Sequence, residues 1–386
     1  MTGILYFSRG TKCFYGGYAT KGCSNQRTSV QTLEHDLKKF AYLVILLGCT
    51  LLLPLASAEG QADDVVVGVN LVNQPDHLTP QEQDTILDNM KAAGVRVIRA
   101  GIASNDKSLD FAQRVYAHGI KIEWFAWGIP SASGNMILSS ADPETFRTYF
   151  QPLLAKLESK GIVLTGMELG NEINWSNHDL GQSGTGRILT LEDLSRDPKG
   201  QQVAKGYLQY IKLLAVLKDI RDHSKLNQHT PILSAGSGEL DASPKGRDAV
   251  SLKAMIEFLR AHGMDQYVDA YGIHFYPQGN ASPADRLASL DRDFAECGSG
   301  GGGAKPCWLT EWGLPVHSGK SCPVNEDNRI RIFTELRKDF NQLAQRGRLK
   351  GILLYDWEGG IEDVDPYGAF ICGAVTTSGR LAVAPL

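Results

Sequence analysis

The chain has 386 residues, of which 42% are hydrophobic and 21% charged, a globular composition that excludes wholesale disorder and fibrous repeats. Its formal net charge of −4 excludes the general positive field of a nucleic-acid-binding protein, so we expect no nucleic-acid partner. The length fits one or two domains.

The N-terminal part of the chain has the features of an export signal. Residues 41–56 form an uncharged, mostly apolar run that follows Lys38 and Lys39 and leads into the small residues Ala56 and Ala58. These features are typical of a secretory signal peptide and predict cleavage after Ala58. An uncleaved anchor is the weaker alternative, because the run is shorter than the roughly 20 residues that span a bilayer.

Removal of the leader, residues 1–58, changes the charge and the cysteine count. The leader contains six basic and two acidic residues, so the exported part, residues 59–386, carries −8. We expect this part to be secreted or periplasmic, monomeric, and without a stable membrane span.

Four cysteines remain after the leader, at positions 297, 307, 322 and 372. An even number in an exported chain predicts two disulfides, for which three pairings exist. We favour Cys297–Cys307, which closes a glycine-rich loop, and Cys322–Cys372, which ties a late loop to the C-terminal segment. No cysteine–histidine spacing suggests zinc, and we expect no metal site.

From residue 65 onward, short β-branched apolar runs alternate with longer amphipathic stretches. The expected strands are 65–71, 95–102, 120–128, 163–172, 231–237, 269–277, 307–313 and 351–358. The expected helices include 79–93, 141–160, 201–223, 252–262, 283–295 and 325–346. Strands that alternate with helices indicate βαβ units and a parallel sheet.

Eight such units predict an α/β protein with a single (β/α)8 TIM barrel, which typically has about 250 residues. No glycine-rich nucleotide-binding motif follows the first strand, which disfavours an open nucleotide-binding sheet and a cofactor. In such barrels the site is formed by the loops after the strands. The longer of these loops are 176–198, 314–325 and 359–386.

Two expected strands end in a carboxylate. Glu172 follows Asn171 at the end of strand 163–172, and Glu311 lies in the run Thr-Glu-Trp-Gly that ends strand 307–313. Burial of a carboxylate at such a place costs free energy, unless the group is paired with a partner or takes part in function. Two that face each other across a barrel mouth suit glycoside hydrolysis, in which one protonates the leaving oxygen and the other attacks the sugar.

These motifs resemble those of the clan A retaining glycoside hydrolases, with a family 5-like or family 39-like barrel and no single family selected. The resemblance implies that Glu172 is the acid/base and Glu311 the nucleophile. It also implies that Arg99 supports the nucleophile and that Asn171 contacts the substrate 2-hydroxyl. Further implied substrate contacts are His274 and Tyr276, the latter beside the nucleophile, and Trp357, the floor of the −1 sugar subsite.

The residue types agree with these roles. As a nucleophile, Glu311 needs a low pKa, which Arg99 and the Tyr276 hydroxyl could provide. A retaining reaction requires the two carboxyl groups to lie roughly 5–5.5 Å apart. Trp127 and Trp175 are also expected to stack on sugar rings, with core packing as the alternative.

Other polar residues are expected to have structural roles or to lie on the surface. Glu168 and Glu123 are expected to be buried partners of an arginine or a hydroxyl. Loop histidines such as His77 could line the cleft, although such residues commonly lie on the surface.

The sequence therefore predicts an exported retaining β-glycoside hydrolase that cleaves β-linked poly- or oligosaccharide by double displacement, without metal or cofactor. One alternative is a non-catalytic carbohydrate-binding barrel of the same fold. Another is a barrel lyase or aldolase, which would need a strand-end lysine or metal ligands. The presence of both Glu172 and Glu311 favours the hydrolase.

Overall fold

The computed structural model describes residues 65–71, 75–126, 137–181, 184–240, 246–299, 304–316, 322–357 and 366–386. The predicted leader with its cleavage position after Ala58, and Trp127, lie outside these residues. Within the described ranges, no helix is both long enough and apolar enough to cross a membrane.

Eight parallel strands form the central sheet. They are β1 (Val66–Asn70), β2 (Val97–Gly101), β3 (Lys121–Ala126), β4 (Gly166–Leu169), β6 (Ile232–Leu233), β8 (Tyr271–Phe275), β9 (Cys307–Trp312) and β10 (Leu349–Leu354). Their order, β6-β4-β3-β2-β1-β10-β9-β8, makes each strand the neighbour of the next in the chain.

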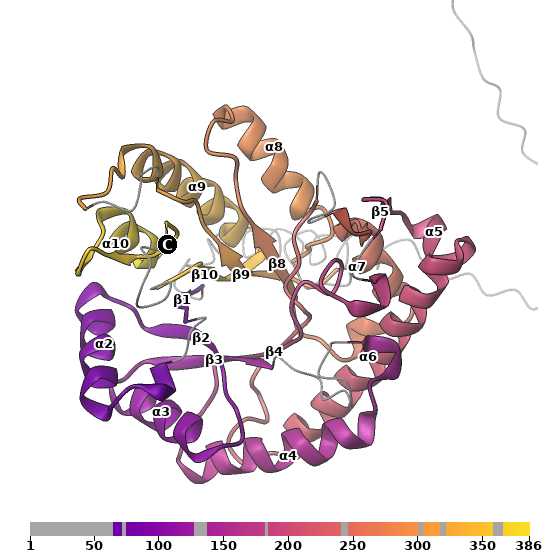
Figure 1. Ribbon diagram of the computed structural model, residues 1–386, viewed down its shortest axis with the longest axis horizontal. Coiled ribbons are helices and arrows are strands. Elements are labelled where there is room, and N and C mark those ends of the chain that lie inside the picture. The colour runs from indigo at the N-terminus through magenta and orange to yellow at the C-terminus, as the bar shows by residue number, and fades with distance from the viewer. Residues whose placement is uncertain are drawn as a thin grey trace, which may run out of the picture. The chain divides into compact units, whose positions relative to one another are not determined.

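The two end strands of this order, β6 and β8, meet through the single bridges Leu233–Ala270 and Ser237–Ile273. Figure 1 shows the strands at the centre with helices around them. This nearly closed barrel is consistent with the predicted (β/α)8 fold, and every predicted strand overlaps an observed one.

The helices lie on the outside of the strands (Figure 1). They are α2 (Pro80–Ala93), α3 (Asp106–Ala117), α4 (Pro143–Ser159), α5 (Leu191–Arg196), α6 (Pro198–Asp222), α7 (Leu252–Ala261), α8 (Pro283–Asp293), α9 (Asp327–Gln345) and α10 (Thr377–Val383). Short 3-10 turns are η2 (Pro75–His77), η3 (Leu138–Ser140), η4 (His178–Leu180) and η6 (Met264–Gln266). Two small sheets pair β5 (Ile188–Leu189) with β7 (Ala249–Val250) and β11 (Phe370–Ile371) with β12 (Ala374–Val375).

Local sequence explains where the helices begin and end. In α2, Thr79 and Glu82 form a reciprocal capping box, and Pro80 occupies the first helical turn. Gly94 ends the helix in the left-handed conformation with φ 95°, which a residue without Cβ adopts at little cost. The six predicted helices are confirmed, whereas α3, α5 and α10 had no prediction of their own.

The strands are buried on both faces, as expected for a parallel sheet covered by helices. One small cluster, formed by Val97, Leu233, Ala270, Trp308 and Leu353, draws on strands or strand edges all around the barrel. A Cβ on Gly351 would lie 2.4 Å from the Trp308 ring, so the glycine makes room for the indole. Trp308 therefore packs in the core.

Among the predicted strands that end earlier than expected are β4 and β10. β4 ends at Leu169 because Gly170 and Glu172 adopt positive φ angles of 81° and 47°. β10 ends at Leu354, three residues before Trp357. Both differences concern residues that the sequence placed in the site.

Both favoured disulfides are present. Cys297–Cys307 connects the segment after α8 to the start of β9, and Cys322–Cys372 connects the segment before α9 to the β11–β12 turn. Two disulfides are compatible with an extracellular protein.

Candidate active site

The C-terminal ends of the barrel strands surround a cavity of about 930 Å³. Glu311 comes from β9, Arg99 from β2 and Asn70 from β1, while Glu172 follows β4. The lining residues are Asn70, Leu71, Asp76, His77, Arg99, Ala100, Gly101, Phe125, Asn171, Glu172, Tyr276, Glu311, Tyr355 and Tyr367.

Glu311 is buried and held at both carboxylate oxygens. Arg99 Nη1 donates to Oε1 at 2.8 Å, and the Tyr276 hydroxyl donates to Oε2 at 2.6 Å. Burial alone would raise the pKa of Glu311, but the charges of His274 and Arg99 and these two hydrogen bonds lower it below its ordinary value. Glu311 is therefore stabilised as a carboxylate.

The guanidinium of Arg99 is 3% exposed and is shared among four side chains. Besides Glu311, its nitrogens donate to Glu168 at 2.5 Å and to Asn70 and Asn171 at 2.8 Å each. Arg99 thus orients the polar groups at the base of the cavity.

Asn70 was not singled out in the sequence. It accepts from Arg99 and donates through Nδ2 to the Thr310 carbonyl at 2.9 Å. The available signal was an amide directly after the apolar run of the first strand.

Two further glutamates lie below the cavity, fully buried. Glu168 accepts from Arg99 and, at 2.7 Å, from the Gly236 N–H. Glu123 lies 3.7 Å from Arg99 Nε. Burial and the nearby charge of Glu168 raise the pKa of Glu123 well above its ordinary value, against the opposing effect of Arg99.

Glu172 has a left-handed backbone conformation with φ 47°, which is uncommon for a non-glycine residue. Its N–H donates to the Gly236 carbonyl at 2.6 Å, and its carbonyl accepts from the N–H groups of Trp175 and Ser176. These hydrogen bonds hold the backbone so that the side chain, 21% exposed, faces His274.

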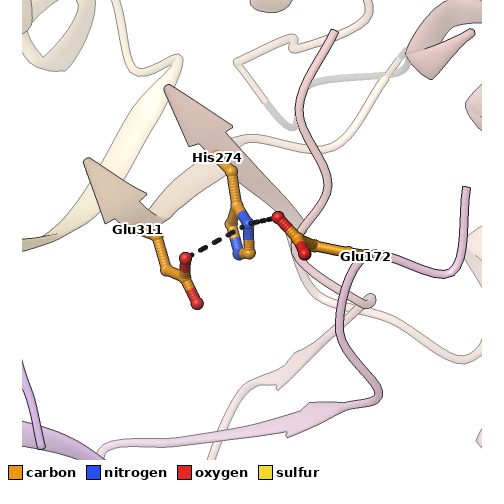
Figure 2. A group of neighbouring side chains, drawn as sticks. All are labelled: Glu172, His274 and Glu311. Carbon is orange, nitrogen blue, oxygen red and sulfur yellow. Dashed lines mark hydrogen bonds and ion pairs between the residues drawn. The ribbon is translucent and has the colours of Figure 1, made fainter. Parts of the chain in front are cut away.

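His274 lies between the two carboxylates (Figure 2). Its Nδ1 is 3.2 Å from Glu172 Oε1 and 3.5 Å from Glu311 Oε2. Burial would lower the pKa of His274, but the charge of Glu311 and the hydrogen bond and charge of Glu172 raise it above its ordinary value. Both carboxylates therefore favour the protonated form of His274.

Within the described part of the chain, Glu172, His274 and Glu311 form the one group whose donor atoms could hold a metal ion. These atoms lie within 4.8 Å of one another. The expectation of a metal-free site stays a prediction.

Gly236 permits the close packing beneath the pair. A Cβ there would lie 2.3 Å from both His274 Nε2 and Thr310 Oγ1, and 2.6 Å from Glu168 Oε1. Because its N–H binds Glu168 and its carbonyl binds the N–H of Glu172, Gly236 connects Glu168 at the base of the site to Glu172. The sequence offered no signal for this role.

The structure corrects the expected position of Trp357. Trp357 is 1% exposed, stacks on Phe370 with ring centroids 5.8 Å apart, and does not line the cavity. The reason is that β10 ends at Leu354, after which the N–H of Trp357 donates to the Asn70 carbonyl.

Three tyrosines form an aromatic wall of the cavity in its place. The rings of Tyr276, Tyr355 and Tyr367 contact one another edge-on, with centroids 5.8–5.9 Å apart. Tyr355 lies two residues before Trp357, so the sequence alone did not show which aromatic ring reaches the mouth. Tyr367 lies in a loop without any such signal.

The remaining predicted residues have different positions. Asn171 and His77 line the main cavity. Trp175 is half-buried and lines a second cavity of about 360 Å³, which also contains Glu172 and Tyr276. The expected sugar contacts of Trp127 concern a residue outside the described ranges.

Comparison of the sequence with known proteins does not assign the chain to a family. No family model matches the chain, and no curated protein matches it.

Solved structures share the fold at low identity. Fungal β-1,4-galactanases match with a TM-score of 0.52 and 13% identity over 82% of this chain and 93% of theirs. The β-glycosidase BGL167 matches with a TM-score of 0.54 and 12% identity, over 83% of this chain and 95% of its own. The virulence factor SghA, solved with the substrate analog salicin, matches with a TM-score of 0.53 and 14% identity. The match covers 84% of this chain and 97% of SghA. The chain therefore has the same barrel fold as these galactanase and glycosidase structures.

Proposed function

We propose that this protein is a retaining β-glycoside hydrolase of the clan A type, with Glu172 as acid/base and Glu311 as nucleophile. The observation that carries the proposal is the short spacing of the two carboxylates, which have oxygens within 4.8 Å of each other at the mouth of the cavity. Retaining enzymes have a separation of roughly 5–5.5 Å, whereas inverting enzymes need roughly 6.5–9.5 Å for a water.

In the first step, a carboxylate oxygen of Glu311 attacks the anomeric carbon while the bond to the leaving oxygen breaks. Glu172 donates its proton to that oxygen, so the leaving sugar departs as a neutral alcohol. Arg99 and Tyr276 favour the charged form of Glu311 that this attack requires.

In the second step, Glu172 removes a proton from water, whose oxygen attacks the anomeric carbon from the opposite face. The bond to Glu311 breaks and the β configuration is restored. Both carboxylates face His274. When Glu172 gives up its proton and Glu311 is glycosylated, the single negative charge of the pair passes from Glu311 to Glu172, and hydrolysis returns it to Glu311. His274 therefore balances the charge that alternates between the carboxylates.

We further propose that the protein is exported and cleaves β-linked poly- or oligosaccharide. The leader predicts export, and two disulfides agree with an oxidising compartment. The aromatic wall beside Glu311 suits the apolar faces of sugar rings.

The first test uses a panel of β-linked glucan, mannan, xylan and galactan. We expect turnover of at least one polymer, and a loss of about 10²–10⁴-fold in Glu172→Gln. The loss in Glu311→Ala should be at least as large. Circular dichroism checks that both variants are folded. Binding of a glycan without turnover by the wild type would instead support the carbohydrate-binding alternative.

Azide distinguishes the two roles by product configuration. In Glu172→Ala, azide should attack the glycosyl-enzyme and give the β-glycosyl azide, whereas in Glu311→Ala it should attack the substrate directly and give the α-glycosyl azide. A 2-fluoro sugar should label Glu311, as measured by mass spectrometry of peptides. A label elsewhere, or an inverted product from the wild type, would contradict the assignment.

A further inference from the structure

Two cavities meet at the proposed acid. The larger one contains Glu311 and Arg99, whereas the smaller one lacks both and shares only Glu172 and Tyr276 with it. The acid must contact the leaving oxygen. The smaller cavity contains Glu172 but not Glu311, so it is positioned to receive the leaving group.

Trp175 provides a fixed aromatic surface in this smaller cavity. It follows Glu172 by three residues, and its N–H donates to the Glu172 carbonyl at 2.9 Å. The guanidinium of Arg247 lies over the indole, 4.6 Å from the ring centroid. Arg247 is itself 9% exposed, so this cation–π contact holds the ring in place from a buried position.

The smaller cavity is also lined by polar and charged side chains. Gln278 precedes α8, and α8 contributes Asp285, Ser289 and three further charged residues, which are Arg286, Arg292 and Asp293. An aromatic surface together with polar groups is typical of a pocket that binds a small polar ligand in one orientation. A sugar ring combines an apolar face with hydroxyls at its edge and matches this lining.

We infer that the smaller cavity binds the sugar on the leaving-group side of the scissile bond, stacked on Trp175, and that the substrate is a glycan chain with sugars on both sides of that bond. This inference rests on the proposed function. It assigns Trp175 a role in recognising the leaving sugar and Arg247 a role in positioning Trp175.

The test compares two substrates that differ in the leaving group. One is the β-linked pentasaccharide of the sugar that the panel selects among glucose, mannose, xylose and galactose, and the other is its β-glycosyl fluoride. Fluoride is too small to occupy the cavity. In Trp175→Ala, kcat/KM for the pentasaccharide should fall about 10–100-fold, and at least about tenfold more than for the fluoride.

Three further variants make the result specific. Trp175→Phe should lose less than Trp175→Ala because it keeps an aromatic face, and Arg247→Met should show a smaller loss of the same selectivity. Leu287→Ala, at an exposed position of α8 outside the cavity lining, should change neither substrate.

Equal losses on both substrates in Trp175→Ala would overturn the inference, since Trp175 would then support Glu172 or the fold alone. That failure differs from failure of the proposed function. The latter would appear as absence of wild-type turnover or as full activity of Glu311→Ala.

Discussion

Tyr276 contributes to the ionisation of Glu311 through a single hydrogen bond. Its hydroxyl donates to Glu311 Oε2 at 2.6 Å, and this contact is one of the causes that lower the pKa of Glu311 despite burial. The reaction requires the ionised carboxylate, so the acid limb of the pH–rate profile should lie below the ordinary titration range of a glutamate.

Tyr276→Phe should move this acid limb to higher pH. Removal of the hydroxyl withdraws a stabilising interaction from the charged form, so the pKa of Glu311 rises and the carboxylate protonates earlier as the pH falls. The pH dependence of kcat/KM measures the shift. Tyr271→Phe is the matched control, because its hydroxyl binds Asp265 at 2.7 Å; an equal shift in both variants would contradict the assignment.

At the scale of elements, α9 holds the loop that carries Tyr367. Arg329 on α9 is 2% exposed and donates to the carbonyls of Pro366, Tyr367 and Gly368. It also donates to the hydroxyls of Thr376 and Ser378. Burial lowers the pKa of Arg329 to about 10, although Glu326 opposes this effect.

Arg329→Met should destabilise the protein by about 2–4 kcal/mol, because several buried carbonyls and hydroxyls lose their donor. It should also raise KM, since Tyr367 loses the support that keeps it in the cavity wall. Urea denaturation and steady-state kinetics measure the two effects.

The control for this prediction lies on the same helix. Arg331 is half-exposed and pairs with Glu335 one turn away, so Arg331→Met should cost less than about 0.5 kcal/mol. Similar losses of stability in the two variants would show that Arg329 does not hold the loop.

At the scale of the whole molecule, the barrel collects the site from residues that are far apart in the chain. Arg99 and Glu311 are separated by 212 positions, yet parallel strands bring their C-terminal ends to one face of the barrel. The site therefore depends on closure of the barrel, to which the disulfides contribute by restricting the unfolded chain.

The two disulfides should differ in their effect on stability. Cys322–Cys372 closes a loop of 50 residues and Cys297–Cys307 one of 10, for which loop entropy gives about 4 and about 3 kcal/mol. The double variant Cys322→Ser/Cys372→Ser should therefore unfold at lower urea concentration than Cys297→Ser/Cys307→Ser. The reverse order would show that local packing outweighs loop entropy.

The sequence by itself determined the alternation of strands and helices, because periodic burial and helix caps act over a few residues. Thr79, Pro80 and Gly94 set the limits of α2 in this way. It also indicated the strand-end motifs around Glu172 and Glu311 and the cysteine pairs, which depend on residue type and on order along the chain.

Only the tertiary structure decided which side chains reach the cavity. Tyr355 lines the cavity and Trp357 does not, because β10 ends at Leu354 and the N–H of Trp357 then donates to the Asn70 carbonyl. The roles of Asn70 and Gly236 depend on distances to residues on other strands. Such contacts arise when the barrel closes, and no local pattern in the chain encodes them.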